Sequence, residues 1–245
     1  MIGTRRVLLL TGASRGIGHA TVKRFSDAGW RIITCSRDAV PAECKRDPNW
    51  THHITADLGN PRDLDRFVAE ASALLDGSLH ALVNNAGVSP KSPTRERLGC
   101  LNGDIEAWHA VFQLNFFVPL ILARAFANPL AQGKGAIVNV TSIAGHAVHP
   151  FAGSAYSTSK AALSALTREM AAEFAALGVR VNAVAPGEIK TAMLSPETTV
   201  LLPRIPLNRL GEPEDVAGTI FFLCSDDAAY VTGTEISVNG GQHVY

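Results

Sequence analysis

Short apolar segments alternate with longer amphipathic segments along the chain, and this alternation constrains the fold more than any other feature. The short segments are mostly apolar at every position, as expected for parallel strands covered on both faces. They are Val7–Thr11, Arg31–Cys35, His52–Thr55, His80–Val83, Ala136–Thr141, Val179–Val184 and Glu235–Val238. Helices are predicted between them at Gly16–Ala28, Pro61–Leu75, Asp104–Ala127, Ser154–Leu177 and Glu212–Cys224. The pattern predicts an α/β fold, a doubly wound parallel sheet of about seven strands with helices on both faces.

The chain is expected to form one domain. Its 245 residues contain no repeat, low-complexity tract or linker, so residues 1–245 are interpreted as a single unit. Pro41 and Pro48 fall between the second and third strands, where we expect an irregular connection rather than a helix. Two long loops, residues 88–103 and 186–211, follow predicted strand ends, where open α/β sheets bind ligands. The second loop is predicted to be a substrate lid.

Charge and cysteine content disfavour several kinds of partner and site. Lys+Arg and Asp+Glu both number 22, whereas a nucleic-acid or anionic-membrane binder normally carries a basic excess. The first apolar run ends at Thr11, too short for a signal peptide, and the stretch 116–123 is too short to span a membrane. The cysteines lack C-x-x-C spacing, and His52 and His53 would point to opposite faces of a strand. We therefore predict no metal site and a cytoplasmic protein with reduced thiols.

A glycine-rich turn follows the first predicted strand directly. It reads Thr-Gly-Ala-Ser-Arg-Gly-Ile-Gly over residues 11–18 and leads into a predicted helix. Glycines let the backbone approach a pyrophosphate closely, and the free N–H groups at a helix start attract that anion. A tight strand–helix turn without a ligand is the alternative, so this motif alone is a weak signal, although its position directly after the first strand favours the phosphate site.

Five motifs in order resemble the short-chain dehydrogenase/reductase family, and the resemblance spans essentially the whole chain. They are the turn at 11–18, Asn-Asn-Ala-Gly at 84–87, the set Asn115, Ser142, Tyr156 and Lys160, Pro186-Gly187 with Thr191, and residues 206–215 leading to 239–241. The resemblance implies a single NAD(P)-binding Rossmann-type domain. It assigns cofactor contacts to Gly12, Ser14, Arg15, Gly16, Ile17, Gly18, Arg37, Asp57, Leu58, Asn84, Ala86, Gly87, Tyr156, Lys160, Pro186, Gly187, Ile189 and Thr191.

The Tyr–Lys pair is suited to proton transfer. Tyr156 and Lys160 lie four residues apart on a predicted helix and so share one face. A nearby ammonium lowers the pKa of a tyrosine, which can then exchange a proton with a carbonyl or alcohol oxygen. Ser142, at a strand end, would position the substrate oxygen. The resemblance gives Asn115 a water that links Lys160 to solvent. The Tyr-x-x-x-Lys interval disfavours the family's enoyl-reductase branch.

The second strand bears on the choice of cofactor. In relatives that prefer NAD, an acidic residue at its end binds the adenosine ribose, but Ser36 and Arg37 stand there in this chain. A guanidinium suits the 2′-phosphate of NADP, and Arg15 could contact the same phosphate from the other side. Both arginines could instead be solvated surface charges, and Asp38 could reach the ribose. We predict that NADP(H) is preferred and that NAD(H) remains possible.

The sequence leaves the substrate open. The leading hypothesis is an oxidoreductase (EC 1.1.1.-) acting on a small ketone or secondary alcohol. A 3-oxoacyl-[acyl-carrier-protein] reductase is an alternative, although its possible docking residues Arg124, Lys134 and Arg168 form no basic cluster. A catalytically silent dinucleotide-binding regulator is another. His146, His149 and Phe151 are expected near the pocket. Family resemblance implies a homotetramer or homodimer.

Overall fold

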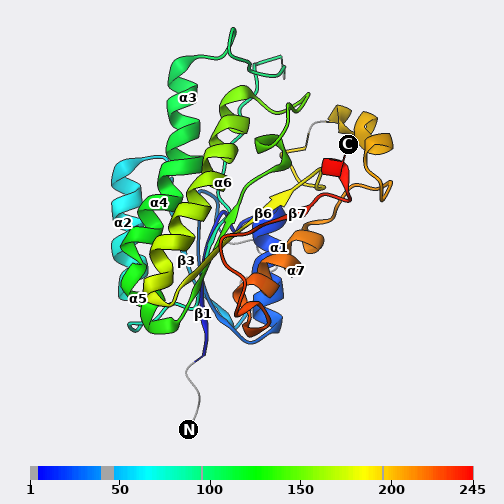
Figure 1. Ribbon diagram of the computed structural model, residues 1–245. Helices are drawn as coiled ribbons and strands as arrows, with labels where there is room; N and C mark the ends of the chain where they lie inside the picture. Colours follow the sequence, from blue (N-terminus) through cyan, green and yellow to red (C-terminus); the bar gives the residue numbers. More distant parts are fainter. Residues whose placement is uncertain (1–4, 40–46, 95, 195, 245) are drawn as a thin grey trace.

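The computed structural model describes residues 5–39, 47–94, 96–194 and 196–244. Within these residues, seven strands form one parallel sheet in the order β3-β2-β1-β4-β5-β6-β7 (Figure 1). The strands are β1 (Val7–Thr11), β2 (Arg31–Ser36), β3 (Trp50–Thr55), β4 (Ala81–Asn84), β5 (Ala136–Val140), β6 (Arg180–Pro186) and β7 (Glu235–Val238). The predicted fold class is confirmed.

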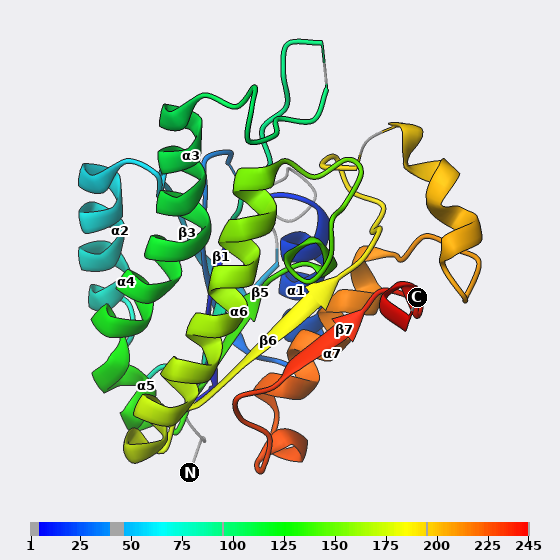
Figure 2. The same ribbon diagram turned by 45° about the horizontal axis from the view of Figure 1, so that its top comes forward.

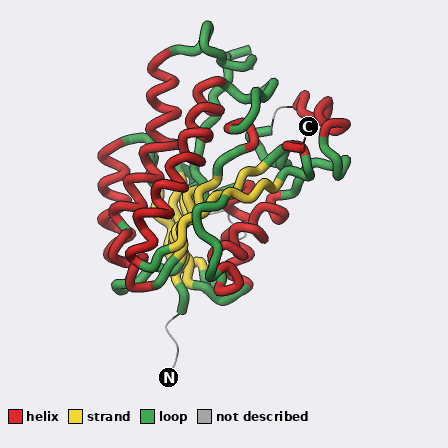
Figure 3. The backbone as a smooth tube through the Cα atoms, in the orientation of Figure 1, coloured by secondary structure: helices red, strands yellow, loops and turns green. Residues whose placement is uncertain are grey.

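Helices cover both faces of the sheet in three layers (Figure 3). The helices α1 (Gly16–Asp27) and α7 (Pro213–Cys224) lie on one face, and α2 (Pro61–Ala73), α4 (Val118–Ala125) and α6 (Ser154–Phe174) lie on the other. Alternate residues of β1 enter the two resulting cores, with Leu8 and Leu10 packed in one and Leu9 in the other. Apolar strands without alternation are therefore what this double coverage requires.

The strand order reverses beside β1. The chain places β2 and β3 on one side of β1, and then returns to place β4 on the other side, with Leu8 opposite Ala81. Ligands of open α/β sheets bind at this switch point, beyond the carboxyl ends of the strands. Figure 2 shows the loops after β4 and after β6 at that same end of the sheet.

The predicted helix 104–127 is present as one helical stretch over residues 105–125, but it is not α-helical throughout. It consists of α3 (Ile105–Phe112), a π-helical turn (Gln113–Phe117) and α4, and the short α5 (Ala127–Gly133) follows after Phe126. Pro119 has no N–H, so the carbonyl of Asn115 cannot receive the usual bond from four residues later. A wider π turn accommodates this break, and such turns often occur at functional sites.

The two long loops contain some regular structure. Lys91 and Arg97 form an isolated antiparallel bridge within the first loop, and residues 196–204 form a 3-10 segment within the second. Leu201 and Ile205 of the second loop are 4% and 3% exposed, so they pack into the domain itself. Of the connection predicted between residues 38 and 49, residues 40–46 lie outside the described part of the chain.

Among the described residues, one helical stretch, Ile105–Ala125, is long and apolar enough to cross a membrane by length and composition alone. Only 28% of its most apolar window is buried within the monomer. A helix that packs inside a protein passes the same test, so this finding carries little weight for a membrane.

Candidate active site

The glycine turn packs tightly against the end of β4. A Cβ atom on Gly18 would lie 2.0 Å from the carbonyl oxygen of Gly12, and one on Gly12 would lie 2.8 Å from Nδ2 of Asn85. Gly12 and Gly16 have φ angles of 74° and 56°, which disfavour any side chain. The turn therefore requires glycine at these positions, and together with Ser14, Arg15 and Ile17 it lines a cleft of about 560 Å³.

Helix α1 begins at this turn with unsatisfied N–H groups. Its N-cap residue, Arg15, makes no side-chain capping bond, and its first turn carries no acidic residue. Side-chain caps are present at α2 (Asn60), α3 (Asp104) and α7 (a capping box), whereas α6, like α1, has none. Uncapped N–H groups and the positive end of the helix dipole beside a glycine turn suit a pyrophosphate. The residues present thus fit a dinucleotide.

Asn84 and Asn85 have different places in the structure. The side chain of Asn84 is buried between strands, where its Nδ2 donates to Oδ1 of Asn139 at 2.8 Å, and it does not line the cleft. Asn85 was not predicted as a contact, yet its Nδ2 donates to the carbonyls of Thr11 and Gly12 at 3.0 and 2.9 Å. Asn85 therefore holds the glycine turn, whereas Asn84 links β4 to β5. Ala86 and Gly87 line the cleft.

Tyr156, Lys160 and Ser142 meet on the opposite wall of the cleft. Lys160 is 4% exposed, its Nζ donates to the carbonyl of Val140 at 2.6 Å, and burial lowers its pKa to about 8. Burial raises the pKa of Tyr156, a hydrogen bond with Ser142 opposes that rise, and the charge of Glu188 adds to it. Tyr156 is therefore protonated at neutral pH, as a proton donor to a carbonyl oxygen needs to be.

Asn115 lies behind this group rather than in the cleft. Its amide accepts a bond from the N–H of Val88 at 2.9 Å, and donates to the carbonyl of Val88 at 3.0 Å and to Oγ of Ser159 at 3.1 Å. A Cβ on Gly87 would lie 3.2 Å from Oδ1 of Asn115 and 3.4 Å from Nζ of Lys160. The structure thus brings Asn115, Gly87 and Lys160 together, and the water that the resemblance gives to Asn115 stays a prediction.

The end of β2 forms the far wall of the cleft. Arg15 and Arg37 are exposed, line the cleft and make no ion pair with another described residue. The backbone of Asp38 is fixed, because its carbonyl accepts from Oγ of Ser36 at 2.7 Å and from Nε2 of His53 at 2.9 Å. Asp38 also lines the cleft, so both the arginines and this carboxylate remain candidates for the ribose end.

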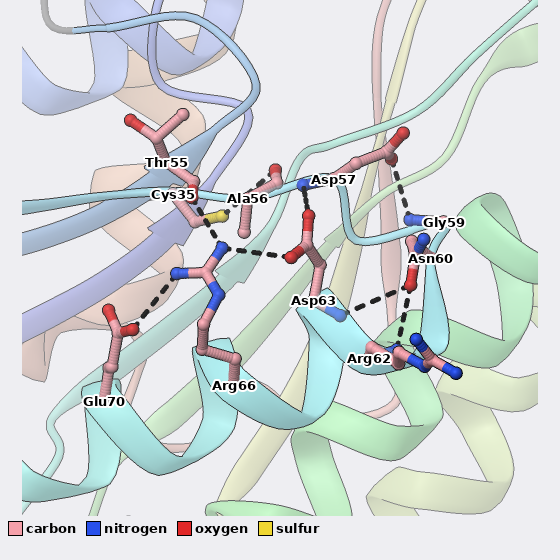
Figure 4. Close-up of polar contacts among 10 residues, drawn as sticks. All are labelled: Cys35, Thr55, Ala56, Asp57, Gly59, Asn60, Arg62, Asp63, Arg66 and Glu70. Atoms are coloured by element: carbon pink, nitrogen blue, oxygen red, sulfur yellow. Dashed lines mark hydrogen bonds and ion pairs between the residues drawn. The ribbon is translucent and has the colours of Figure 1, made fainter.

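The turn after β3 carries Asp57 and Leu58, which line the cleft, and Figure 4 shows the polar contacts that hold Asp57. Oδ1 of Asp57 accepts from the N–H of Gly59 at 3.0 Å, while the N–H of Asp57 donates to Asp63 at 3.0 Å. Arg66 donates to the carbonyl of Thr55 at 2.9 Å and to Asp63 at 3.1 Å, so α2 holds this turn in place. The predicted cofactor contacts Asp57 and Leu58 are therefore on a turn that hydrogen bonds from α2 hold in place.

The segment after β6 forms the roof of the cleft, with Pro186, Gly187, Ile189 and Thr191 all lining it. Gly187 is required by close packing, since its Cβ would lie 2.6 Å from Cβ of Asn239. Thr191 reaches the glycine turn, where its Cγ2 would be 3.0 Å from a Cβ on Gly16. Thr191 and the glycine turn, which are far apart in the sequence, are therefore in contact and line the same part of the cleft.

The remaining wall carries a pair of side chains, His149 and Glu188, that the sequence did not predict to be in contact. His149 and Phe151 line the cleft as expected, and Nε2 of His149 lies 2.5 Å from Oε1 of Glu188. His146 does not line it and pairs with Glu235 at 2.6 Å instead. In the described part of the chain, no three His, Cys, Asp or Glu side chains lie together as a metal site would need.

A parallel sheet with a glycine turn at its switch point and an uncapped helix behind it defines a dinucleotide-binding α/β protein. The family model described as enoyl-(acyl carrier protein) reductase matches residues 12–243. Protein FixR of Bradyrhizobium diazoefficiens is 56% identical over 99% of this chain and 88% of its own length. A 3-oxoacyl-[acyl-carrier-protein] reductase of Synechocystis is 38% identical over 99% and 98%. An oxidoreductase of Brucella ovis solved with a partially ordered NAD has a TM-score of 0.82 and 49% identity over 96% of this chain and 100% of its own.

The chain therefore belongs to the short-chain dehydrogenase/reductase family of oxidoreductases. The resemblance inferred from five motifs is confirmed. Membership supports a nicotinamide cofactor, but it leaves the choice between NAD and NADP and the substrate open.

Proposed function

We propose that this protein reduces a ketone to a secondary alcohol, reversibly, with NADPH as the preferred cofactor. The observation that carries the proposal is the position of Tyr156. Its hydroxyl shares one cleft with the glycine turn and is hydrogen-bonded to Ser142, with Lys160 buried beside it. A nicotinamide supplies the hydride when bound. The side chains orient the carbonyl of the substrate and supply the proton.

Each side chain has a distinct task in this reaction. Ser142 holds the carbonyl oxygen against the hydroxyl of Tyr156, which donates the proton as the carbon is reduced. The ammonium of Lys160, 5.8 Å from the centre of the tyrosine ring, stabilises the phenolate that remains. In the reverse direction the phenolate takes the proton of the alcohol. Oxidation is therefore favoured by conditions that deprotonate Tyr156.

The exposed guanidinium groups of Arg15 and Arg37 support the preference for NADPH. Both line the cleft and neither is engaged by a carboxylate of a described residue, so both are available to a 2′-phosphate. The Brucella ovis relative is described with NAD, which makes the preference a point to test.

A carbonyl substrate fits the site better than an enoyl substrate. The matching family model carries the enoyl-reductase description. However, Tyr156 and Lys160 stand four residues apart on α6, an interval that disfavours the enoyl-reductase branch. This spacing is why we propose carbonyl chemistry.

A 3-oxoacyl-[acyl-carrier-protein] reductase is supported by the Synechocystis relative but less by the surface. An acidic carrier protein would need basic side chains near the cleft. Lys134 stands two residues before β5, at the amino end of that strand, and so lies at the end of the sheet opposite the cleft. Lys91 and Arg97 lie near the cleft, but they donate to the carbonyls of Phe151 and Ala152. A small, unattached substrate therefore fits better.

A catalytically silent, dinucleotide-binding regulator is the second candidate. The relative that is 56% identical carries the name Protein FixR, which states no reaction. Such a protein would bind the cofactor without turning over any ketone or alcohol.

One assay separates these candidates. Purified protein is given NADPH or NADH with a panel of ketones, and the loss of reduced nicotinamide absorbance is followed. We expect turnover with NADPH, and Tyr156→Phe should lower kcat by about a hundredfold or more while cofactor binding is retained. Equal turnover by this variant would refute the proposed role of Tyr156. Binding without turnover in the parent protein would favour the regulator.

We also propose that copies of the chain associate through α3, α4 and α6, giving a homodimer or homotetramer. Ile105, Phe117 and Ile121 are 64%, 45% and 37% exposed on the helical stretch 105–125, and exposed apolar side chains that form a contiguous patch mark protein–protein contacts. Sedimentation should show an oligomer that Phe117→Glu dissociates. A monomeric parent protein would contradict this. The cytoplasmic location stays a prediction.

A further inference from the structure

A buried carboxylate stands at the substrate end of the cleft. Glu188 directly follows Pro186-Gly187, is 6% exposed and lines the cleft. Its Oε1 lies 2.5 Å from Nε2 of His149, whose side chain is 14% exposed. The two residues are 39 positions apart and join the end of β6 to the segment before α6. The family motifs identified above do not include this pair.

The backbone determines the protonation state of His149. The N–H groups of Phe151 and Ala152 both donate to Nδ1 of His149, at 3.2 and 3.1 Å. Because an N–H group needs a lone pair as its acceptor, Nδ1 carries no hydrogen. The hydrogen of the neutral ring is therefore on Nε2, where it is donated to Glu188. The pair thus has the net charge of one carboxylate rather than that of a neutral ion pair.

No cation of the described residues pairs with this carboxylate. Among the described residues, no Lys or Arg nitrogen lies within ion-pair distance of Glu188. Of the cations on the cleft wall, Arg15 and Arg37 stand at the dinucleotide end, whereas Lys91 donates to the carbonyl of Phe151 and Lys160 to that of Val140. The neighbouring Lys190 is paired with Glu212. A buried charge normally has a partner of opposite sign, because its desolvation is costly.

The carboxylate is close to the reacting end of the cleft. Besides burial, which is the main cause, its charge raises the pKa of the Tyr156 hydroxyl. Glu188, Tyr156 and Ser142 all line the same cleft, so a substrate whose carbonyl is held by Tyr156 and Ser142 shares that space with Glu188. A cationic group on the substrate would therefore supply the opposite charge that Glu188 lacks.

We propose that Glu188, oriented by His149, binds a cationic nitrogen of the substrate, so that the preferred substrates are amino ketones and the corresponding amino alcohols. This rests on the proposed carbonyl reduction, in which the carbonyl carbon gains a hydride and its oxygen gains the proton of Tyr156. The ammonium group changes no bond. It forms a charge-assisted hydrogen bond to Glu188 that fixes the distance from nitrogen to carbonyl.

The test compares ketones that differ only by charge. Aminoacetone is matched with butanone, and N-methyl-4-piperidone with 4-methylcyclohexanone, at neutral pH with saturating NADPH. We expect kcat/KM of the parent protein to favour the amine of at least one pair by about tenfold or more. Glu188→Gln keeps an oxygen that accepts from His149 and removes only the charge. It should bring the ratio of kcat/KM for the amine to kcat/KM for its neutral match down to about one, and any effect on Tyr156 cancels in that ratio because it acts on both ketones.

A second variant controls for loss of charge in general. Glu169→Gln removes an exposed carboxylate from α6 outside the cleft and should leave the preference intact. No preference for the amine in the parent protein, or a preference that survives Glu188→Gln, would overturn the inference. So would a Glu188→Gln variant whose only change is the ratio of NADP⁺ to NADPH affinity, since the carboxylate would then serve the oxidised nicotinamide.

Failure of the proposed function gives a different result. If the protein reduces butanone and shows no preference for the charged ketone, only the role of Glu188 is refuted and the proposed carbonyl reduction stands. If the protein reduces neither member of a pair, the proposed activity is refuted. The role of Glu188 is then tested by measuring ligand binding with calorimetry. In that measurement N-methyl-4-piperidone should bind the complex with NADP⁺, and Glu188→Gln should weaken that binding by about tenfold. Binding that is absent or unchanged would overturn the inference.

Discussion

The two ends of the cleft are built on opposite principles. The dinucleotide end is shaped by backbone: Gly12, Gly16 and Gly18 leave no room for a side chain, and its cations Arg15 and Arg37 are exposed. The substrate end is shaped by side chains, with the carboxylate of Glu188 buried and hydrogen-bonded at the centre. Water screens exposed charges but not buried ones. Steric changes should therefore matter most at the dinucleotide end, and polar changes at the substrate end.

The largest effect is expected from a single methyl group at the dinucleotide end. In Gly18→Ala the new Cβ would lie 2.0 Å from the carbonyl oxygen of Gly12, so the turn must move. We expect cofactor affinity to fall by about a hundredfold or more, because the N–H groups of the turn lose their alignment. Fluorescence titration with NADPH measures this. Gly218→Ala, in α7 with nothing within 4 Å of the new methyl, is the matched control and should bind normally.

Removal of a polar group should have its largest effect on stability at the substrate end. His149→Leu leaves Glu188 without its donor and the N–H groups of Phe151 and Ala152 without an acceptor. The free energy of unfolding should fall by about 3 kcal/mol, measured by urea denaturation without cofactor. The matched change is His146→Leu, whose ring is 50% exposed where it meets Glu235. It should cost under about 1 kcal/mol. Equal losses would contradict the contrast between the two ends.

The same division explains what could be predicted from the sequence. The sheet and the glycine turn depend on local patterns, and the chain order brings the turn to the switch point. The partnership of Glu188 with His149 joins residues 39 positions apart, and no spacing rule predicts it. Asn84 was predicted as a cofactor contact because it belongs to a motif, but the alternation of β4 turns its side chain toward Asn139. Pro119 is the sequence signal for the π turn at Asn115, although the pattern of residues 104–127 predicts a single uniform helix.

Lys160 lies between the dinucleotide end and the substrate end of the cleft. Because its side chain is buried, the free energy of unfolding of the protein should depend on pH. Its pKa of about 8 in the folded protein is below the ordinary 10.5 of the unfolded chain. Below pH 8 the lysine is charged in both states and burial of the charge costs stability in full. Between about 8 and 10.5 only the folded state releases the proton, so the free energy of unfolding rises with pH, by up to about 3 kcal/mol.

Comparison with Lys160→Met isolates this group. Methionine has no charge to bury, so the variant should be the more stable protein below pH 8, and its advantage should shrink as the pH approaches 10.5. Other groups titrate in both proteins and cancel in the difference. Urea denaturation at several pH values measures it. A difference that does not change with pH would mean that Lys160 is not desolvated as its 4% exposure indicates.

The smallest of these effects is expected for a full reversal of charge at the dinucleotide end. Arg37 is exposed, so its attraction to a 2′-phosphate is screened by water and salt. Arg37→Asp should lower kcat/KM with NADPH by about tenfold and change kcat/KM with NADH much less. Added salt should reduce the preference of the parent protein for NADPH. If NADH is already preferred, or if the variant affects both cofactors equally, Arg37 does not read the phosphate, and Asp38 becomes the group that faces the ribose. A loss far greater than tenfold would show that Arg37 becomes buried when the cofactor binds, and the two ends of the cleft would then be more alike than the free protein indicates.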